Sequence, residues 1–543
     1  MNKHITAPSL RLSGMAVAVA AAMMFSGQAL AFQFNTGDPG LKMRWDNTFK
    51  YSTIYRLHNP DKTQLADFEG SPGGDGDRNF KRGIASNRID WLTEFDVVKD
   101  YKYGGRISAV AWYDDVYQHG NDNHSIWTHN ITVPADQFTA GTKDAVGNGS
   151  RLMDAFVFAK GDIGGMPASV HLGRHAVIYG ETLMDGSNGI AAAQGPVDIV
   201  KAATVPGAQV KEFLLPTNQI SATLQPNDKV SLGASYQFKW EKSPFFAAGS
   251  FLSPNDFVGD GAESFLNIPP IGLAFTRQAD MSPRRGGQWG AQLRYRPDSV
   301  DAEFGIYAAN YHDKTPSAAY LAPTSATTGT YRLAYQEDIR TYGVSASTVL
   351  GSDNVSIEAS LRDNMPITGG MGYVITAPGY TYDNKGNPGY AVGKTAHVTL
   401  VDIHIIQPNA LLKDGGSVAT QFDWHNLRSV TKNPGAMDPT TTKSASKVTV
   451  AFSADWFQAM DGLDLSFPVV LTYAHGRSPI YVGWVEDGGS VDLGVDFKYR
   501  TLWKAGVNYH HFVGSHGTQI GEGHFQQTLW DRDYLSFNIS TSF

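Results

Sequence analysis

No spacing of residues in this chain marks a catalytic centre. The sequence has 16 histidines and no cysteine, so a thiolate metal site and a disulfide scaffold are both excluded. It contains neither the HExxH pattern of zinc peptidases nor the GxSxG pattern that exposes a nucleophilic serine. His510 and His511 are adjacent, so on a strand they point to opposite faces and do not chelate one ion together. We therefore expect no enzyme, no catalytic residue, no bound metal and no cofactor.

The first long loop offers one alternative for metal chemistry. Asp75 and Asp77 flank a glycine, and Asp67 and Glu69 lie close by in the sequence. Carboxylate oxygens are the ligands that calcium prefers, but the spacing lacks the glutamate that closes an EF-hand loop. Calcium binding by this loop therefore stays an open alternative.

Charged residues recur on the polar faces of segments in which apolar and polar side chains alternate. They are Arg88, Asp90, Glu94, Arg106, Glu358 and Arg362. If these segments form the wall of a pore, its interior carries charges of both signs, and such a mixture orients dipolar solutes. The alternative is that these charges only solvate and brace the wall.

Arg174 breaks the pattern of its own segment, because Val170 and Leu172 make its face apolar. An unpaired arginine facing lipid costs about 2–4 kcal/mol at the bilayer midplane. We therefore expect either that a β-bulge at Gly173 turns Arg174 inward or that Arg174 lies near the membrane interface. The predicted pore-lining or selectivity residues are Arg174, Glu181, Asp198, Glu212, Arg362, Arg88 and Arg106.

Residues 179–216 interrupt the strand rhythm. Residues 196–203 predict about two helical turns, with Pro196 at an early position where its missing donor costs little. The stretch is too apolar for a loop in the external medium, so we expect residues 184–212 to fold into the lumen and narrow the pore. The alternative is an external loop packed on its neighbours. The residues expected to face water in the lumen are Asp198, Lys201, Lys211 and Glu212.

The decisive signal for the fold is an alternation of period two along the chain, which a helix cannot satisfy. From Leu41 to Leu57, for example, apolar residues occupy mostly odd positions and polar residues even positions. Counting such segments predicts eighteen strands, at 41–57, 86–99, 103–115, 151–161, 167–180, 213–225, 229–241, 288–297, 301–313, 337–350, 354–363, 393–406, 416–428, 445–459, 463–475, 489–499, 502–513 and 532–543.

Tight connections alternate with long polar ones. The tight ones lie at 225–228, 297–300, 351–354, 460–463 and 499–502, and the long ones at 58–85, 116–150, 243–287, 314–336, 365–392 and 514–532. Short periplasmic turns and long outer loops are typical of outer-membrane barrels, whereas nothing forces this asymmetry on a soluble lectin-like or propeller protein. We predict an all-β transmembrane antiparallel barrel of about eighteen strands. Sixteen stays open, because 151–180 and 393–406 are weakly patterned.

The N-terminal residues predict export. Lys3 and Arg11 precede an apolar run from Met15 to Phe25, and residues 29–31 read Ala-Leu-Ala, the small-x-small pattern of a signal-peptidase site. We assign residues 1–31 to a signal peptide and 32–543 to the barrel, in the outer membrane of a Gram-negative bacterium. The net charge of −8 argues against a nucleic-acid partner.

The last strand ends in Phe543, with Leu535, Phe537 and Ile539 on the same face. This ending resembles the C-terminal signature by which the barrel-assembly machinery recognises outer-membrane barrels. We therefore predict that Phe543 is an assembly signal.

Several motifs resemble one family over nearly all of the exported chain. They are residues 172–181, 196–198, 205–216, 236–241, 253–259, 362–366, 431–435, 462–468 and 527–533. The family is the proteobacterial outer-membrane family registered as domain of unknown function thirteen hundred and two. Its members are often encoded beside a periplasmic lipid-binding-like lipoprotein and an inner-membrane exporter of the resistance-nodulation-division superfamily, within catabolic clusters for hydrophobic compounds. The resemblance thus implies these two partners, besides the lipids of the outer membrane.

Two functions remain at this stage. The first is a passive channel for hydrophobic or amphiphilic small molecules. The second is the outer-membrane component of a multi-protein export or lipid-transfer system, whose periplasmic partner would dock on the short turns. The isolated protein takes up solute in the first case and not in the second.

Overall fold

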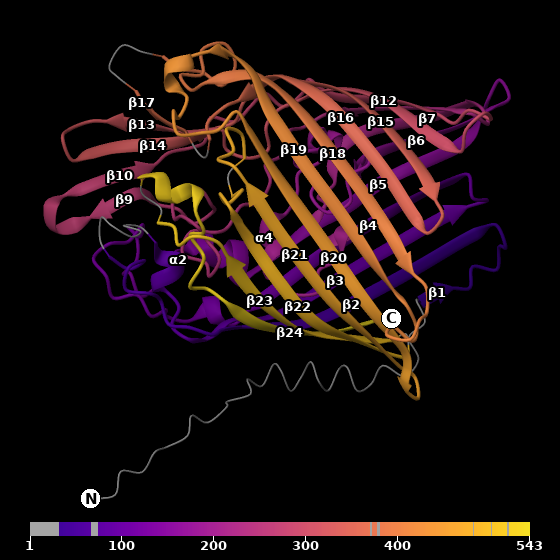
Figure 1. The fold of residues 1–543 in the computed structure, drawn as a ribbon, viewed down its shortest axis with the longest axis horizontal. Coiled ribbons are helices and arrows are strands. Elements are labelled where there is room, and N and C mark those ends of the chain that lie inside the picture. The colour runs from indigo at the N-terminus through magenta and orange to yellow at the C-terminus, as the bar shows by residue number, and fades with distance from the viewer. Residues whose placement is uncertain are drawn as a thin grey trace, which may run out of the picture.

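The chain folds into a closed antiparallel β-barrel in the computed structural model, which describes residues 32–66, 74–369, 372–376, 381–481, 483–500, 502–518 and 521–543 (Figure 1). Each wall strand pairs with the next along the chain, and β24 returns to pair with β2. The wall consists of β2 (Leu41–Arg56), β3 (Gly83–Lys99), β4 (Tyr103–Asp114), β5 (Asn148–Ile163), β6 (Met166–His175), β7 (Thr217–Asn227), β8 (Val230–Gln237), β11 (Gln288–Tyr295), β12 (Ala302–Tyr311), β15 (Ile339–Leu350), β16 (Asp353–Pro366), β18 (Val392–Ile406), β19 (Gly416–Lys432), β20 (Ser444–Met460), β21 (Leu463–His475), β22 (Gly488–Tyr499), β23 (Trp503–Val513) and β24 (Tyr534–Ser542).

This wall confirms the predicted fold class and the count of eighteen strands. The two weakly patterned regions are strands as well, which settles the choice between sixteen and eighteen. The largest difference from a predicted boundary concerns the strand predicted over 167–180, which ends at His175 before the chain turns into the lumen. Short β1 (Phe32–Phe34) pairs with β2 alone and lies outside the closed ring.

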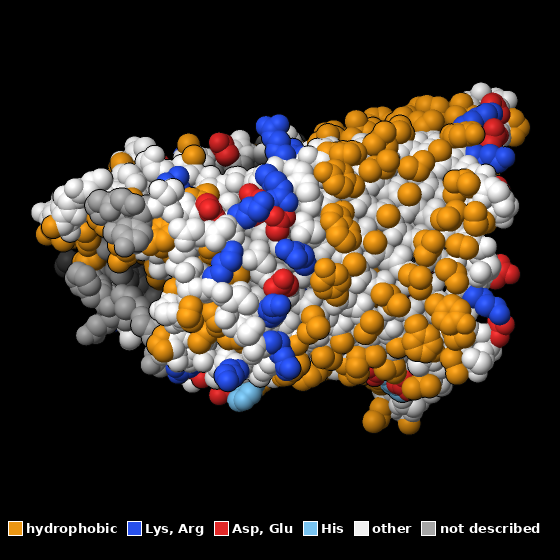
Figure 2. All heavy atoms as spheres, turned by 90° about the horizontal axis from the view of Figure 1, so that it is seen from above, with side chains coloured by type: hydrophobic (Ala, Val, Ile, Leu, Met, Phe, Trp, Pro, Cys, Tyr) orange, Lys and Arg blue, Asp and Glu red, His pale blue; other side chains and the backbone are white. Residues whose placement is uncertain are grey.

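The outer surface of the wall is apolar. Outward side chains such as Leu361 and Val344 are 60% and 55% exposed, and Figure 2 shows hydrophobic side chains covering the barrel between its two polar ends. No helix in the described ranges is long and apolar enough to cross a membrane. A closed barrel satisfies every wall hydrogen bond without an open edge, and an outward apolar band is the mark of a barrel that lies in the outer membrane.

Connection lengths set the two ends of the barrel. At one end the turns are tight: Gly164 and Gly165 join β5 to β6 with φ of +61° and +83°, the left-handed pair that a two-residue hairpin requires. At the other end, long connections carry all the short helices and a second sheet. The helical segments are α2 (Asp75–Arg78), η1 (Val116–Gln118), α3 (Ala140–Thr142), η2 (Lys143–Gly147), η3 (Ile190–Ala193), α4 (Ile199–Thr204), α5 (Val210–Phe213), η4 (Pro269–Ile271), η5 (Pro434–Ala436) and η6 (Gly521–Phe525).

The second sheet was not expected from the sequence. Three connections interpreted as polar loops contribute strands in the order β17-β13-β14-β10-β9. Two of its pairings are parallel and join different loops, β10 with β14 and β13 with β17. Parallel neighbours are distant in sequence, so alternation within one loop does not reveal them. The bounds are β9 (Ser264–Ile268), β10 (Leu273–Arg277), β13 (Ala318–Pro323), β14 (Thr328–Ala334) and β17 (Gly372–Ile375).

Phe543 lies at the seam that closes the barrel. Its N–H donates to Asn47 O at 2.9 Å, and Asn47 N–H donates to Phe543 O at 2.7 Å. The Phe543 ring stacks on Phe49 of β2 with the ring centroids 5.9 Å apart. The last residue therefore joins the final strand to the first.

Deleting Phe543 is expected to lower the amount of folded barrel in the outer membrane, because the deletion removes both hydrogen bonds and the ring contact at the seam. The measurement is the heat-modifiable band in unheated gel samples of outer-membrane fractions. Phe543→Tyr keeps the ring and the backbone and should assemble like the parent. Equal assembly of the deletion and the parent would contradict the assembly role.

Candidate functional site

Residues 176–216 leave β6 at the outer end of the barrel and cross the lumen before the chain re-enters the wall at β7. The predicted lumenal insertion is thus confirmed. The helix within it starts later than predicted, at Ile199 rather than Pro196, because the Asp198 side chain caps it by accepting a hydrogen bond from Lys201 N.

The first half of this segment is held by β16. Glu358 Oε2 accepts a hydrogen bond from Glu181 N at 2.7 Å, and Oε1 accepts one from Ile190 N at 2.8 Å. Gly180 and Gly189 allow this approach, because a Cβ at these positions would lie 2.5 and 2.2 Å from the Glu358 oxygens. A buried carboxylate thus fixes the segment to the wall through charge-assisted hydrogen bonds.

Arg362 of β16 binds one turn in the first half of the segment. Its Nη2 donates to the carbonyl oxygens of Ser187, Asn188 and Gly189 at 3.0, 2.7 and 2.8 Å. Its Nη1 donates to Tyr481 Oη at 3.1 Å. Arg362 is 2% exposed, so it holds the backbone of the segment from inside the protein.

Further anchors of the first half lie on β19 and β20. Gln421 Oε1 accepts hydrogen bonds from the backbone of Leu183 and Met184, and Lys447 forms an ion pair with Asp185. Burial alone would raise the pKa of Asp185, but the Lys447 ammonium and the hydrogen bonds from Ser187 lower it to about 2. Asp185 therefore keeps its negative charge at ordinary pH.

The second half of the segment is joined to the opposite wall by ion pairs. Lys50 of β2 contacts Glu212 at 3.0 Å, with both side chains 3% exposed. Lys201 lies 3.3 Å from Asp90 of β3 and 3.4 Å from Glu212. Arg151 of β5 contacts Asp198 at 2.5 Å. The expectation that Asp198, Lys201 and Glu212 face water is therefore wrong: the wall carries opposite charges at these places, and these three side chains are buried.

Of the remaining charged residues predicted for the lumen, some belong to the same wall. Arg88 binds Asp90 with two hydrogen bonds of 2.8 and 2.9 Å. Lys211 pairs with Glu94, and its side chain remains 46% exposed, in line with the expectation that it faces water. Arg106 reaches Asp96 at 2.7 Å, nearer the short-turn end of β4. The structure thus gathers the charges of β3 and β4 around the inserted segment.

Glu181 faces the β11 and β12 wall. Its Oε1 lies 3.2 Å from Arg294 Nη2 and accepts hydrogen bonds from Tyr307 and Ser345 at 3.3 and 3.2 Å. The side chain of Glu181 is 16% exposed. It is thus a polar contact between the segment and the wall.

Arg174 is not brought together with the lumenal charges. The pairing of β6 with β5 and β7 is continuous through Gly173, so the bulge predicted there is absent. Arg174 lies next to the outer end of β6, where Nη1 contacts Glu241 at 2.8 Å. Of the two alternatives drawn from the sequence, the position near the membrane interface fits the structure.

A cavity of about 460 Å³ remains between α4, the wall and the outer loops. Its lining includes apolar side chains, which are Val110, Trp112, Val146, Val200, Val205 and Phe245. Its charged lining includes Arg88, Arg151, Lys201, Asp198 and Glu212. The cavity is therefore lined by both apolar side chains and paired charges.

Two buried donors at this cavity lack a hydrogen-bond partner among the described residues. They are Lys201 Nζ, which has only its two ion pairs, and Trp112 Nε1. The Arg88 and Arg151 guanidinium groups lie 5.5 and 5.8 Å from the Trp112 ring. Lys201 Nζ and Trp112 Nε1 are thus available to donate hydrogen bonds to a solute in the cavity.

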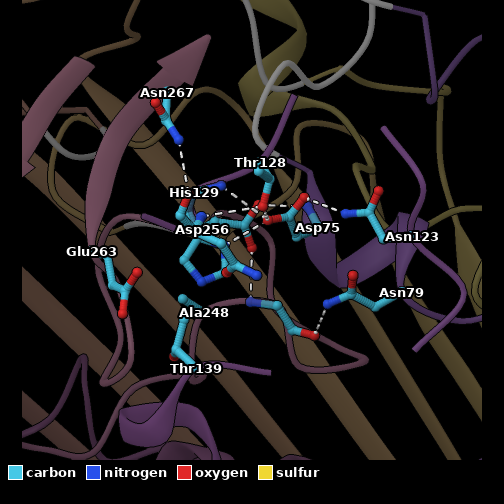
Figure 3. A network of polar contacts seen from close by, with 12 residues as sticks. Asp75, Asn79, Asn123, Thr128, His129, Thr139, Ala248, Asp256, Glu263 and Asn267 are labelled. Atoms are coloured by element: carbon cyan, nitrogen blue, oxygen red, sulfur yellow. Dashed lines mark hydrogen bonds and ion pairs between the residues drawn. The ribbon is translucent and has the colours of Figure 1, made fainter. Parts of the chain in front are cut away.

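A second polar cluster joins the outer loops. Asp75 Oδ2 accepts hydrogen bonds from His129 Nδ1 at 2.6 Å and Thr128 Oγ1 at 2.7 Å (Figure 3). Asp75 N donates to Asp256 Oδ2 at 2.6 Å. The three side chains Asp75, His129 and Asp256 come from three different loops and are each at least 97% buried. The cluster fastens these loops over the outer end of the barrel.

One ligand atom from each of these three side chains lies within 4.8 Å of the others, which raises the question of a cation. All four carboxylate oxygens already accept a hydrogen bond from the protein, including Asp75 Oδ1 from Asn123 and Asp256 Oδ1 from Gly249. Burial and the nearby Asp75 charge raise the pKa of Asp256 to about 6. The three side chains therefore form a hydrogen-bonded junction between the loops.

The alternative of calcium binding by the first long loop involves Asp75 as well. Asp75 belongs to that junction, and Asp77 contacts Arg56 at 2.6 Å. These two carboxylates therefore point to different partners and do not converge. Asp67 and Glu69 lie outside the described residues, as does the predicted signal peptide.

Several wall partners of the segment were not recognisable in the sequence. Lys50, Arg151, Gln421 and Lys447 were not singled out, although Lys50 lies on the charged face of a segment that alternates cleanly. Each is at least 47 residues from its partner in the segment. No local pattern links residues so far apart.

A family model described as "Protein of unknown function (DUF1302)" matches residues 12–543. Similar solved structures include OccAB1 of Acinetobacter baumannii, with 11% identity, 95% of this chain and 98% of that chain covered and a TM-score of 0.44. They also include the outer membrane channel DcaP of the same species, with 9% identity, 94% and 99% coverage and a TM-score of 0.39. A BenF-like porin from Pseudomonas fluorescens Pf-5 is similar at 10% identity, 93% and 98% coverage and a TM-score of 0.40. No curated protein matches the chain.

Proposed function

The chain belongs to the family described as protein of unknown function DUF1302, and we propose that it is an outer-membrane channel for hydrophobic or amphiphilic small molecules. The observation that carries this proposal is the lumen itself. The inserted segment leaves a cavity of about 460 Å³ lined by apolar and charged side chains, whereas barrels of 16–18 strands otherwise enclose a wide aqueous channel.

The size and lining of the cavity support this class of solute. Small-molecule pockets measure roughly 300–1,000 Å³ and combine apolar walls with a few polar groups that fix orientation. Here Phe245 and Val200 supply apolar contact, while Lys201 Nζ and Trp112 Nε1 offer donors to an acceptor group. A molecule with an apolar body and a head group that accepts hydrogen bonds fits both the apolar lining and these donors.

The test is uptake by the purified protein in liposomes, with a radiolabelled aromatic carboxylate compared with a sugar of similar mass. We expect faster uptake of the carboxylate. Phe245→Ser should reduce that preference, because it replaces an apolar side chain at the cavity without touching an ion pair. Phe238→Ser is the matched control, since Phe238 is 47% exposed and is not part of the cavity lining.

Equal uptake of sugar and carboxylate would contradict the proposed solute class. No uptake by the isolated protein, together with uptake or release in cells that hold the periplasmic lipoprotein and the inner-membrane exporter, would favour the export or lipid-transfer role instead. Growth of a deletion strain on hydrophobic carbon sources then identifies the solute.

A further inference from the structure

Four basic side chains form a row around one side of the barrel. They are Arg340 on β15, Lys394 on β18, Arg428 on β19 and Lys443 directly before β20, and all four are exposed. The pairing keeps them level: Arg340 lies opposite Asp363 of β16, Lys394 lies opposite Ser429, and Leu427 N donates to Lys443 O at 2.7 Å. We call these four residues the basic row.

The basic row marks the outer border of the apolar belt. Tyr342 and Leu361 lie two residues nearer the short-turn end than Arg340 and Asp363, and their side chains are 56% and 60% exposed. On the face seen in Figure 2, Lys and Arg side chains follow the line where the hydrophobic belt ends and the outer loops begin. This is the level at which lipid headgroups meet the wall.

The row has far more positive charge than its neighbours neutralise. The side chains of Arg340, Arg428 and Lys443 have no hydrogen-bond or ion-pair partner in the part of the chain that the structure describes. Lys394 has a single carboxylate, Asp363, at 3.9 Å, and its own side chain is 56% exposed. Arg284, farther out, is paired instead with Glu337 and Asp338.

We propose that the basic row binds the phosphate groups of phosphorylated glycolipids in the outer leaflet of the outer membrane. Neighbouring strands lie about 4.8 Å apart, so the row spans roughly 19 Å of wall and meets several phosphates at once. Guanidinium and ammonium groups recognise phosphate oxygens through charge-assisted hydrogen bonds. The belt below positions the acyl chains of the same lipids. This inference does not depend on what the channel conducts.

The experiment titrates the detergent-solubilised full chain with diphosphorylated lipid A and counts bound lipids by native mass spectrometry. The quadruple variant R340Q/K394Q/R428Q/K443Q should bind about tenfold more weakly, since each basic residue near an anionic headgroup layer contributes separately to binding. The matched control is K102Q/R296Q/K413Q/R500Q, which removes the same charge from exposed positions at the short-turn end and should bind like the parent.

Two further arms make the result specific. Asp363→Asn removes the one carboxylate of the row and should strengthen binding, so the proposal is tested even if the quadruple variant fails to fold. Dephosphorylated lipid A should bind the parent weakly. Equal binding of parent and quadruple variant, or equal competition by phosphatidylglycerol, would overturn the assignment to phosphorylated glycolipid.

Discussion

Replacing residues 184–212 with a short Gly-Ser linker is expected to raise single-channel conductance several-fold in planar bilayers. The segment crosses the lumen and touches walls on opposite sides, from Glu358 on β16 to Lys50 on β2. Without it, the ring of eighteen strands encloses the wide aqueous channel typical of barrels this size. Conductance rises because the narrowest cross-section of the pore is removed.

The barrel itself should survive this deletion. Its wall hydrogen bonds run between neighbouring strands and do not pass through the segment. The deletion does remove Glu212 from Lys50 and Lys201 from Asp90, but Asp90 keeps Arg88, and Lys50 then faces a water-filled lumen and is hydrated. The heat-modifiable gel band should therefore persist.

A milder variant provides the control for this prediction. Lys50→Met with Glu212→Met replaces the buried Lys50–Glu212 ion pair with side chains of similar length, and Lys201 keeps its ion pair with Asp90. Such replacements are often tolerated, because burying an ion pair costs most of what the pair gains. Conductance close to that of the parent is expected. If the deletion also leaves conductance unchanged, the segment does not restrict the pore.

The wall could be predicted from the sequence because each strand carries its own evidence. In β2, Lys50 and Ser52 face inward and Trp45 faces outward, and that alternation is visible without any knowledge of the neighbours. The turns then fix which strands are adjacent. Insertion of residues 184–212 was also predictable, because an apolar stretch with Gly and Pro breaks has no place in the external medium.

The partners of the inserted segment could not be predicted in the same way. Glu212 meets Lys50 across 162 residues, and Asp75 meets His129 across 54. These contacts depend on how the closed wall and the packed loops bring distant residues together. The wrong expectation for Asp198, Lys201 and Glu212 has the same origin. The sequence shows that these residues are charged, but it does not show which charged residue of the wall each one contacts.

Neutralising Arg362 or Glu181 is expected to shift the reversal potential of the channel in a salt gradient. We propose that both act on the solute path through charge: Arg362 supplies a buried positive charge behind the turn at 187–189, and Glu181 a negative charge opposite Arg294. Charges act more strongly in the low-dielectric interior of a protein than in water. Arg362→Gln should therefore make the pore more cation-selective, and Glu181→Gln more anion-selective.

Arg362→Lys separates charge from bracing. Lysine keeps the positive charge but lacks the planar fork, so it does not reproduce the three hydrogen bonds to Ser187, Asn188 and Gly189. If charge governs selectivity, Arg362→Lys keeps the reversal potential of the parent while Arg362→Gln does not. If the fork matters as a brace, both variants lower the unfolding temperature and both leave selectivity unchanged.

Arg174→Gln is the third charge-neutralising variant. Arg174 lies next to the outer end of β6, where it pairs with Glu241. This ion pair is only 11% and 22% exposed and lies near the membrane interface, apart from the lumenal charges. The shift in reversal potential from Arg174→Gln should therefore be smaller than the shifts from Arg362→Gln and Glu181→Gln, whose groups contact or belong to the inserted segment in the lumen. Three variants that unfold at lower temperature with the parent's uptake and reversal potential at every salt concentration would show that these charges brace the wall.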